Sequence, residues 1–180
     1  VKNLVTMVTP VDFKTPDNML SHWVQNIDID LLVEYQPGHG GFAFVEFCEQ
    51  VERLLAVCDR NTAIGRRNYA ILLLIARLGL RAGEIVALKL GDINWRAAEL
   101  TVQGKGQICD RLPLPQSVGE ALAVYLKNDR PKCSTRRVFV RARAPYRDLK
   151  GSSTVSTIVR RAVEKSGINT PSKGAHLLRH

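Results

Sequence analysis

The chain has 180 residues and a formal net charge of +9, with 45% hydrophobic and 24% charged residues. This length and composition are those of a soluble globular protein with room for one sizeable core. The charge is uneven: residues 1–50 hold two lysines against seven acids, net −5, whereas residues 51–180 have a net charge of +14. So basic a region is typical of nucleic-acid-binding proteins, although a solvated basic surface gives the same composition.

The chain shows no sign of secretion or of a membrane span. Its first residues lack a charged region followed by an apolar stretch and a cleavage site. The apolar run 70–76 is broken by Arg77 and is far too short to cross a bilayer. The four cysteines are isolated, without CxxC or Cys/His spacing. We therefore expect a cytoplasmic protein with reduced thiols.

The sequence changes character near residue 47. Residues 1–47 contain scattered acids, short apolar pieces and the break Pro37-Gly38-His39-Gly40-Gly41, and they predict no stable fold of their own. From about Glu46 the hydrophobic spacing becomes regular. We therefore divide the chain into a poorly defined segment 1–47, either a remnant of an upstream domain or a small subdomain, and a main domain 48–180.

Within the main domain, apolar spacing predicts mostly helices. Helices are expected at Glu46–Cys58, Arg67–Leu78, Ala82–Leu90, Gln116–Asn128 and Thr154–Ser166. Strands are expected at Glu99–Gln103 and Ile108–Leu114, joined by a tight Gly104-Lys105-Gly106 turn, with a third short candidate at Val138–Val140. This order predicts a mainly α fold with a small antiparallel β-sheet, an α+β architecture.

Arg81 lies between two predicted helices, two residues after Gly79, which is a natural helix stop. Glu84 follows three positions later, so its carboxylate can reach back towards Arg81. By itself such a pair is more typical of a surface ion pair of little energetic consequence.

Two further segments place cations where a ligand could reach them. Lys105 lies at the hairpin tip between glycines, which leave room for close approach of a ligand, although a turn with a soluble residue at its tip is also common. His176 and Arg179 are three positions apart and share a face if their segment is helical. His180 is four residues from His176, but no third ligand is evident and a metal site is not expected. An imidazole beside a guanidinium suits an anion better.

The order of these segments resembles the catalytic domain of the tyrosine recombinase (phage integrase) family. The resemblance covers roughly residues 48–180. The stretches that carry it are Tyr69–Ile93, which includes Leu78-Gly79-Leu80-Arg81-Ala82-Gly83-Glu84, then Leu100–Gly106, Arg111–Pro115 and Gly174–His180. Each motif is weak alone, but four in the right order make a specific signal.

The resemblance implies roles for particular residues. Arg81 corresponds to the first catalytic arginine, Lys105 to the hairpin lysine that protonates the leaving 5′ oxygen, and His176 and Arg179 to the HxxR pair. Glu84 would hold Arg81 in place. The implied reaction is site-specific recombination of double-stranded DNA through a phosphotyrosyl intermediate, without metal or cofactor and with self-association on DNA.

The nucleophile expected by the family pattern lies beyond HxxR, where this sequence stops. None of Tyr35, Tyr69, Tyr125 and Tyr146 stands in the expected order. We therefore expect a truncated recombinase that is inactive alone. Two alternatives stay open: a non-catalytic DNA-binding protein, and a non-functional fragment of a mobile element.

Overall fold

The structure is a computed structural model that describes residues 41–104 and 109–168, with side chains described from residue 49 onward. The described helices are α3 (Gly41–Ala56), α4 (Ala63–Leu78), α5 (Ala82–Ala87), α6 (Gln116–Val124) and α7 (Ser152–Ser166), with the short turns η1 (Leu90–Asp92) and η2 (Tyr125–Asp129). The strands are β1 (Ile93–Asn94), β2 (Glu99–Gln103) and β3 (Cys109–Pro113). A mainly helical domain with one small antiparallel sheet is the architecture that the hydrophobic spacing predicts.

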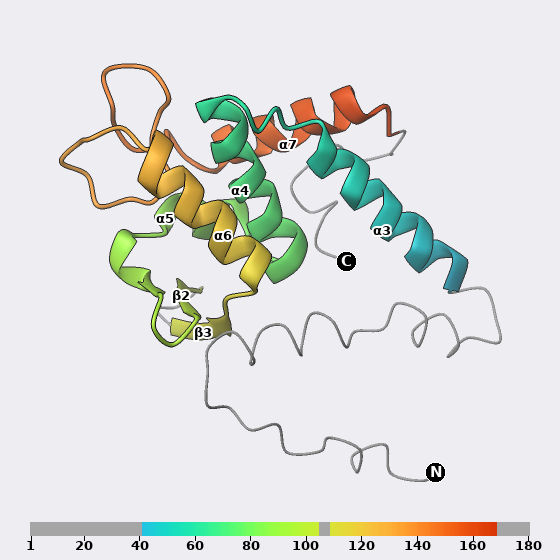
Figure 1. The fold of residues 1–180 in the computed structure, drawn as a ribbon, viewed down its shortest axis with the longest axis horizontal. Helices are drawn as coiled ribbons and strands as arrows, with labels where there is room; N and C mark the ends of the chain where they lie inside the picture. The colour runs from blue at the N-terminus through green and yellow to red at the C-terminus, as the bar shows by residue number, and fades with distance from the viewer. Residues whose placement is uncertain (1–40, 105–108, 169–180) are drawn as a thin grey trace, which may run out of the picture.

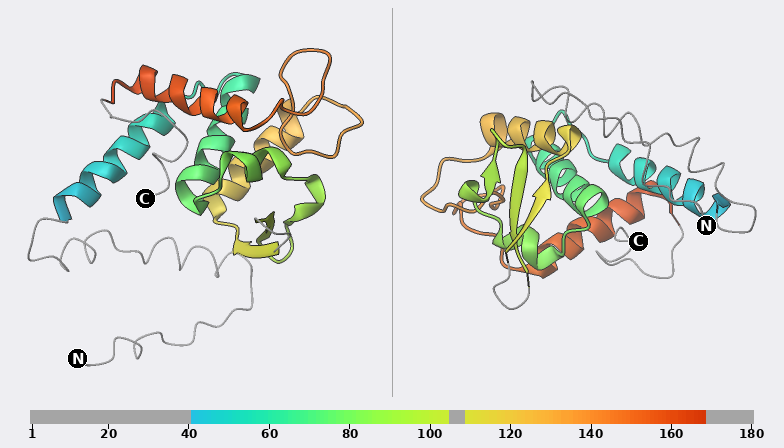
Figure 2. Two further views of the ribbon diagram at one scale, coloured as in Figure 1. Left: turned by 180° about the vertical axis from the view of Figure 1, so that it is seen from behind. Right: turned by 90° about the horizontal axis from the view of Figure 1, so that it is seen from below.

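Helix α4 is the centre of the core (Figure 1). Its residues Ala70–Ile75 are at most 2% exposed, so this helix is surrounded on all sides. Helix α6 packs on one side of α4, and α7, α5 and α3 pack on the others, as the two views of Figure 2 show. The predicted buried central helix is therefore confirmed.

Both ends of α4 are fixed by local hydrogen bonds. The Thr62 hydroxyl accepts the Gly65 N–H at 3.1 Å and donates to the Asp59 carbonyl at 2.9 Å, and this cap starts the helix four residues before the predicted Arg67. At the other end, Gly79 adopts a left-handed φ of 63° and its N–H bonds to the Ile75 carbonyl. A glycine accepts this conformation without a Cβ penalty, so it ends the helix and redirects the chain.

The sheet is a three-stranded antiparallel meander in the order β1-β2-β3. The predicted hairpin is confirmed: Leu100 pairs with Leu112 and Gln103 with Cys109. Leu100 and Val102 on alternate positions of β2 are buried, while β3 is mostly exposed, so one face of the sheet covers the core. The two-residue strand β1 was not predicted.

A long-range contact shortens one predicted helix and changes the pairing of one predicted strand. The helix predicted to reach Leu90 ends at Ala87, and Val138–Val140 is not a strand of the sheet. Instead, Leu88–Leu90 pairs with Arg136–Val138: the Val138 N–H bonds to the Leu88 carbonyl at 2.9 Å, and the Leu90 N–H to the Arg136 carbonyl at 2.8 Å. The extended pairing stops α5, because Leu88 takes a ψ of 129° and becomes buried.

The remaining boundaries differ from the predicted ones by a few residues. Helix α3 begins at Gly41 rather than Glu46 and ends at Ala56, and α7 begins at Ser152 rather than Thr154. Helix α6 continues into η2, a π-type turn, so Gln116–Asp129 is close to the predicted Gln116–Asn128. In the described part of the chain, no helix is long and apolar enough to span a membrane.

Candidate DNA-phosphate site

Arg81 stands at the N-cap of α5, where the chain leaves α4. Gly79 turns the backbone, Leu80 packs into the core at 2% exposure, and Arg81 is the next residue out. Its side chain is 62% exposed. The end of a buried helix thus sets the position of an accessible guanidinium.

Glu84 holds Arg81 by two contacts. One carboxylate oxygen, Oε2, accepts the Arg81 backbone N–H at 2.7 Å, and the other, Oε1, accepts Nη1 at 2.8 Å. The Glu84 side chain is only 12% exposed, so this largely buried carboxylate is a firmer anchor than a surface acid. The predicted reach of Glu84 towards Arg81 is confirmed. Among the described residues, Nε and Nη2 of Arg81 bond to no partner, which leaves donors for a ligand.

Helix α5 contacts two elements, β2 and α7, and the other candidate residues follow these two elements in the chain. It packs against β2, which ends at Gln103, two residues before Lys105. It also packs against α7, which ends at Ser166, ten residues before His176. Lys105, His176 and Arg179 themselves lie outside the described residues. In the described fold, the strand that precedes Lys105 and the helix that precedes His176 and Arg179 therefore both contact α5.

Interactions around α5 fix it against the rest of the domain. Ile85 is fully buried, and the guanidinium of Arg137 donates to the Ala87 carbonyl at the last residue of the helix. A cation at that end also complements the partial negative charge of the helix terminus. Arg137 is positioned in turn by an ion pair with Asp148 at 3.8 Å.

Comparison with known proteins decides the family. The model of the phage integrase family matches residues 48–180. The chain belongs to the phage integrase family. An integrase/recombinase of Sinorhizobium fredii (strain NBRC 101917 / NGR234), y4rA, is 50% identical over 133 residues, which is 73% of this chain and 32% of that protein. This chain therefore spans about a third of that relative's length.

A solved structure shares the fold. The crystal structure of XerA recombinase has a TM-score of 0.61 and 27% sequence identity, over 73% of this chain and 46% of that one. The resemblance seen in the motifs is thus confirmed by both sequence and structure. The mainly helical domain with a small antiparallel sheet is the catalytic-domain fold of tyrosine recombinases.

One match is to a different class of protein. The poly(3-hydroxyalkanoate) polymerase subunit PhaC of Allochromatium vinosum (strain ATCC 17899) is 82% identical over 34 residues, 19% of this chain and 10% of that protein. The integrase model leaves residues 1–47 unmatched, and that segment is long enough to hold such a stretch. Thirty-four residues are too few for an independent domain core, so the match supports no polymerase activity here.

Two tyrosines of the integrase-like region are committed to packing. Tyr125 is 1% exposed, stacks on Phe139 with ring centroids 5.5 Å apart, and its hydroxyl accepts the Val140 N–H at 3.4 Å. Tyr69 packs against the core and carries the Arg60 guanidinium 5.0 Å from its ring centre. Tyr146 is 45% exposed in the segment between Val140 and α7. The interpretation of Tyr125 as a residue of the apolar face is confirmed, whereas Tyr69 is only partly buried and packs against the edge of the core.

Motif reasoning missed a group of cations away from Arg81. The guanidinium groups of Arg67, Arg143 and Arg161 reach one cavity from three different elements. The sequence signal was limited to exposed arginines on α7 and a basic loop near Tyr146. No pattern in the sequence indicated that they meet.

Proposed function

We propose that this chain binds double-stranded DNA and supplies part of the active site of a site-specific tyrosine recombinase. The observation that carries the proposal is the placement of Arg81. Its exposed guanidinium is fixed by Glu84 on α5, a helix that contacts both β2 and α7. The family membership and the basic charge of residues 51–180 support DNA as the ligand.

The proposed roles follow from the chemistry of phosphoryl transfer. Negative charge accumulates on the non-bridging oxygens as the phosphorus becomes five-coordinate, and fixed cationic donors lower that barrier. Arg81, His176 and Arg179 would bind those oxygens, and Lys105 would protonate the leaving 5′ oxygen. A guanidinium is well suited to this because its planar fork matches two phosphate oxygens at once.

Phosphate contact by Arg81 is testable in DNA binding. Arg81→Gln should weaken binding of duplex DNA and reduce the slope of log affinity against log salt by about one, as expected for one lost phosphate contact. Arg53→Gln on α3 is the matched control, because it removes the same charge from an exposed side chain that pairs with Glu49. Equal effects of the two substitutions on affinity and on slope would remove Arg81 from the site.

We further propose that residues 1–180 alone form no covalent adduct with DNA. The Tyr125 hydroxyl is buried and hydrogen-bonded, so it is not available as a nucleophile. The Tyr69 ring is partly buried against the core, and none of the four tyrosines stands where the family pattern places the nucleophile. A nicked suicide substrate traps any phosphotyrosyl link, which a denaturing gel detects. A trapped adduct, mapped by peptide analysis to Tyr35, Tyr69 or Tyr146, would show that the chain carries its own nucleophile. DNA binding without an adduct is the expected result.

The two parts of the chain have different roles in the proposed DNA binding. Residues 48–180 would carry the DNA interface, and the acidic residues 1–47 would not. Removal of residues 1–40 should therefore leave DNA affinity unchanged or slightly raised, because the deleted segment has a net negative charge. A large loss of affinity would contradict the division. Self-association on DNA and a cytoplasmic location follow from the same proposal, and sedimentation with and without duplex DNA tests the self-association.

A further inference from the structure

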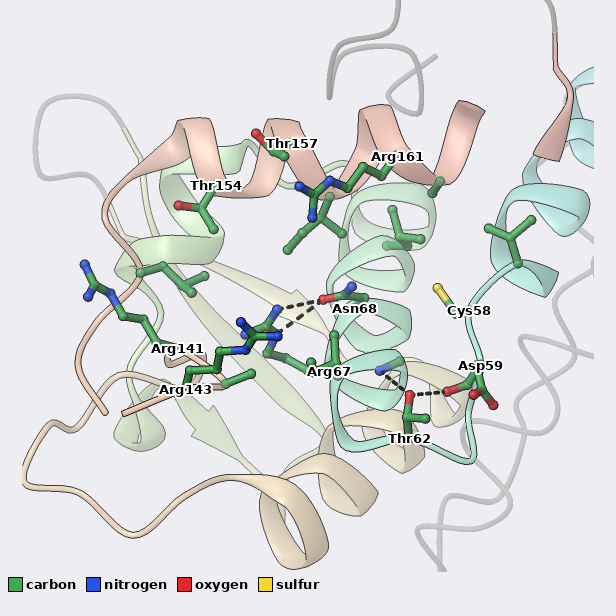
Figure 3. A pocket seen from close by; sticks show the side chains of 18 of the residues that line it. Cys58, Asp59, Thr62, Arg67, Asn68, Arg141, Arg143, Thr154, Thr157 and Arg161 are labelled. Atoms are coloured by element: carbon green, nitrogen blue, oxygen red, sulfur yellow. Dashed lines mark hydrogen bonds between the residues drawn. The ribbon is translucent and has the colours of Figure 1, made fainter. Parts of the chain in front are cut away.

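A cavity of about 870 Å³ lies between the start of α4, one face of α7 and the segment 141–150 (Figure 3). Its floor is apolar and includes Leu72, Leu149 and Ile158. Its walls carry six cationic side chains and one acid. The cations are Arg67, Arg141, Arg143, Lys150, Arg161 and Lys165, and the acid is Asp59. So large an excess of positive charge in a concave site favours an anionic ligand.

Three of these cations come together from separate elements. Arg67 extends from α4, Arg143 from the segment before α7, and Arg161 from α7 itself, and Figure 3 shows their side chains directed into the space between these elements. Within the described part of the chain, none of the six cations makes an ion pair. Asp59 lines the cavity, but its carboxylate forms no described ion pair with any of them.

Arg67 is the most constrained of the three. Its Nη1 donates to the Val140 carbonyl at 3.1 Å, and its Nη2 and Nε donate to Asn68 Oδ1 at 3.1 and 3.3 Å. These acceptors are neutral, so they fix the direction of the guanidinium without balancing its charge. Burial lowers the pKa of Arg67, which agrees with a desolvated cation that lacks an anionic partner.

The arrangement suits a phosphate better than a carboxylate. A carboxylate accepts from donors near one plane, whereas a phosphate group presents several oxygens in a tetrahedral arrangement to donors from several directions. Thr154 and Thr157 also line the cavity and are labelled in Figure 3. The Thr157 hydroxyl donates to the Ser153 carbonyl at 2.9 Å, so Thr154 is the threonine we consider as a further donor. Hydroxyl groups are common partners of phosphate oxygens.

We propose that this cavity binds a phosphate group through Arg67, Arg143 and Arg161. The site is distinct from the one at Arg81. Arg67 lies near the start of α4, whereas Arg81 follows the end of that helix and does not line the cavity. The phosphate belongs either to a nucleic-acid backbone or to a small phosphate ester. The inference holds whether or not the chain takes part in recombination.

The first test measures binding of inorganic pyrophosphate to the full chain by titration calorimetry at low salt. Arg161→Gln should weaken pyrophosphate binding by about tenfold, because one charge-assisted contact is lost. Arg160→Gln is the matched control: it removes the same charge from the neighbouring exposed residue of α7, which does not line the cavity. The control should change the affinity less than twofold. Absence of binding, or equal weakening by both substitutions, would overturn the proposal.

A second pair of substitutions lies in the segment before α7, so its result does not depend on whether α7 folds correctly in the first pair. Arg143→Gln should weaken pyrophosphate binding as Arg161→Gln does, and Arg147→Gln, which lies outside the cavity, should not. Circular dichroism of each variant reports whether the fold is retained. A loss with Arg147→Gln as large as that with Arg143→Gln would show general electrostatic attraction instead of a site.

A competition arm identifies the source of the phosphate. If duplex DNA displaces pyrophosphate and Arg161→Gln weakens both ligands, the cavity binds the DNA backbone. If Arg161→Gln weakens pyrophosphate but leaves DNA affinity unchanged, the ligand is a small phosphate ester. Because DNA affinity itself is measured separately with Arg81→Gln, failure of the cavity and failure of the proposed function give different results.

Discussion

Glu84 binds Arg81 at both its backbone and its side chain, through two carboxylate oxygens at 2.7 and 2.8 Å. The backbone contact satisfies an N–H at the start of α5, and the side-chain contact orients the guanidinium. Glu84 therefore both caps the start of α5 and orients the Arg81 guanidinium, which is the candidate phosphate-binding group. The sequence spacing alone did not distinguish this from an ordinary surface pair, because it does not show that Glu84 is largely buried.

Substitution of Glu84 should lower the stability of the fold and loosen the Arg81 side chain. Glu84→Gln keeps the size of the side chain but removes its charge, and we expect a loss of about 0.5–1 kcal/mol in the free energy of unfolding, since the ion pair is partly screened by solvent. Urea titration measures this loss, and the Arg81 Nε–H resonance reports the order of the guanidinium. Glu164→Gln, on the exposed face of α7, is the control. An unchanged Arg81 resonance in Glu84→Gln would contradict the positioning role.

The ion pair between Arg66 and Asp129 should make the free energy of unfolding fall at low pH. Nε and Nη2 of Arg66 donate to the two carboxylate oxygens of Asp129, each at 2.6 Å, and the Asp129 side chain is 4% exposed. This hydrogen-bonded guanidinium lowers the pKa of Asp129 below its ordinary value. The stabilisation is therefore fully present above the unfolded aspartate pKa of about 3.9, and it is lost as the pH falls through the folded-state pKa.

Urea midpoints at about pH 6 and about pH 3 test this dependence. The midpoint of the wild-type chain should fall more between these values than that of Asp129→Asn, which is less stable at the higher pH but has no carboxylate to protonate. Asp110→Asn, at an exposed position of β3, should keep the full wild-type dependence. The same fall in Asp129→Asn as in the wild type would show that other carboxylates dominate.

The Tyr125 hydroxyl should contribute to stability through a single buried bond. It accepts the Val140 N–H at 3.4 Å, and Val140 is fully buried. Tyr125→Phe leaves that N–H without its partner, and we expect a loss of about 1 kcal/mol, the lower end for a buried unsatisfied donor because the bond is long. Thermal unfolding of Tyr125→Phe and of the exposed control Tyr146→Phe measures the difference. Equal melting temperatures would mean that water or a rearranged backbone satisfies the Val140 N–H.

Alanine substitution of two glycines only four residues apart should change the free energy of unfolding in opposite directions. Gly79 has a φ of 63°, so Gly79→Ala should destabilise the fold by about 1–2 kcal/mol although no atom obstructs the new methyl group. Gly83 lies inside α5 with a helical backbone and open space around it, so Gly83→Ala should stabilise the fold by up to about 1 kcal/mol. Free energies of unfolding from urea titration check both signs. Destabilisation by Gly83→Ala would indicate that α5 is strained.

The sequence by itself determined the family, the fold class and most of the helices. Hydrophobic periodicity marks α4 and α7 because each buries one or more faces, and Gly79 marks the end of α4 because few other residues accept its backbone conformation. The motif order identified the family because its residues are local in the sequence. Local signals of this kind are readable without coordinates.

Only the tertiary structure decided where α5 stops and which cations meet. Leu88–Leu90 leaves the helix because it pairs with residues 136–138, nearly fifty positions away, and no local preference encodes that pairing. The convergence of Arg67, Arg143 and Arg161 likewise depends on how α4 and α7 pack. Contacts between distant segments follow from the burial of the whole core, and a single sequence shows the residues but not their meeting.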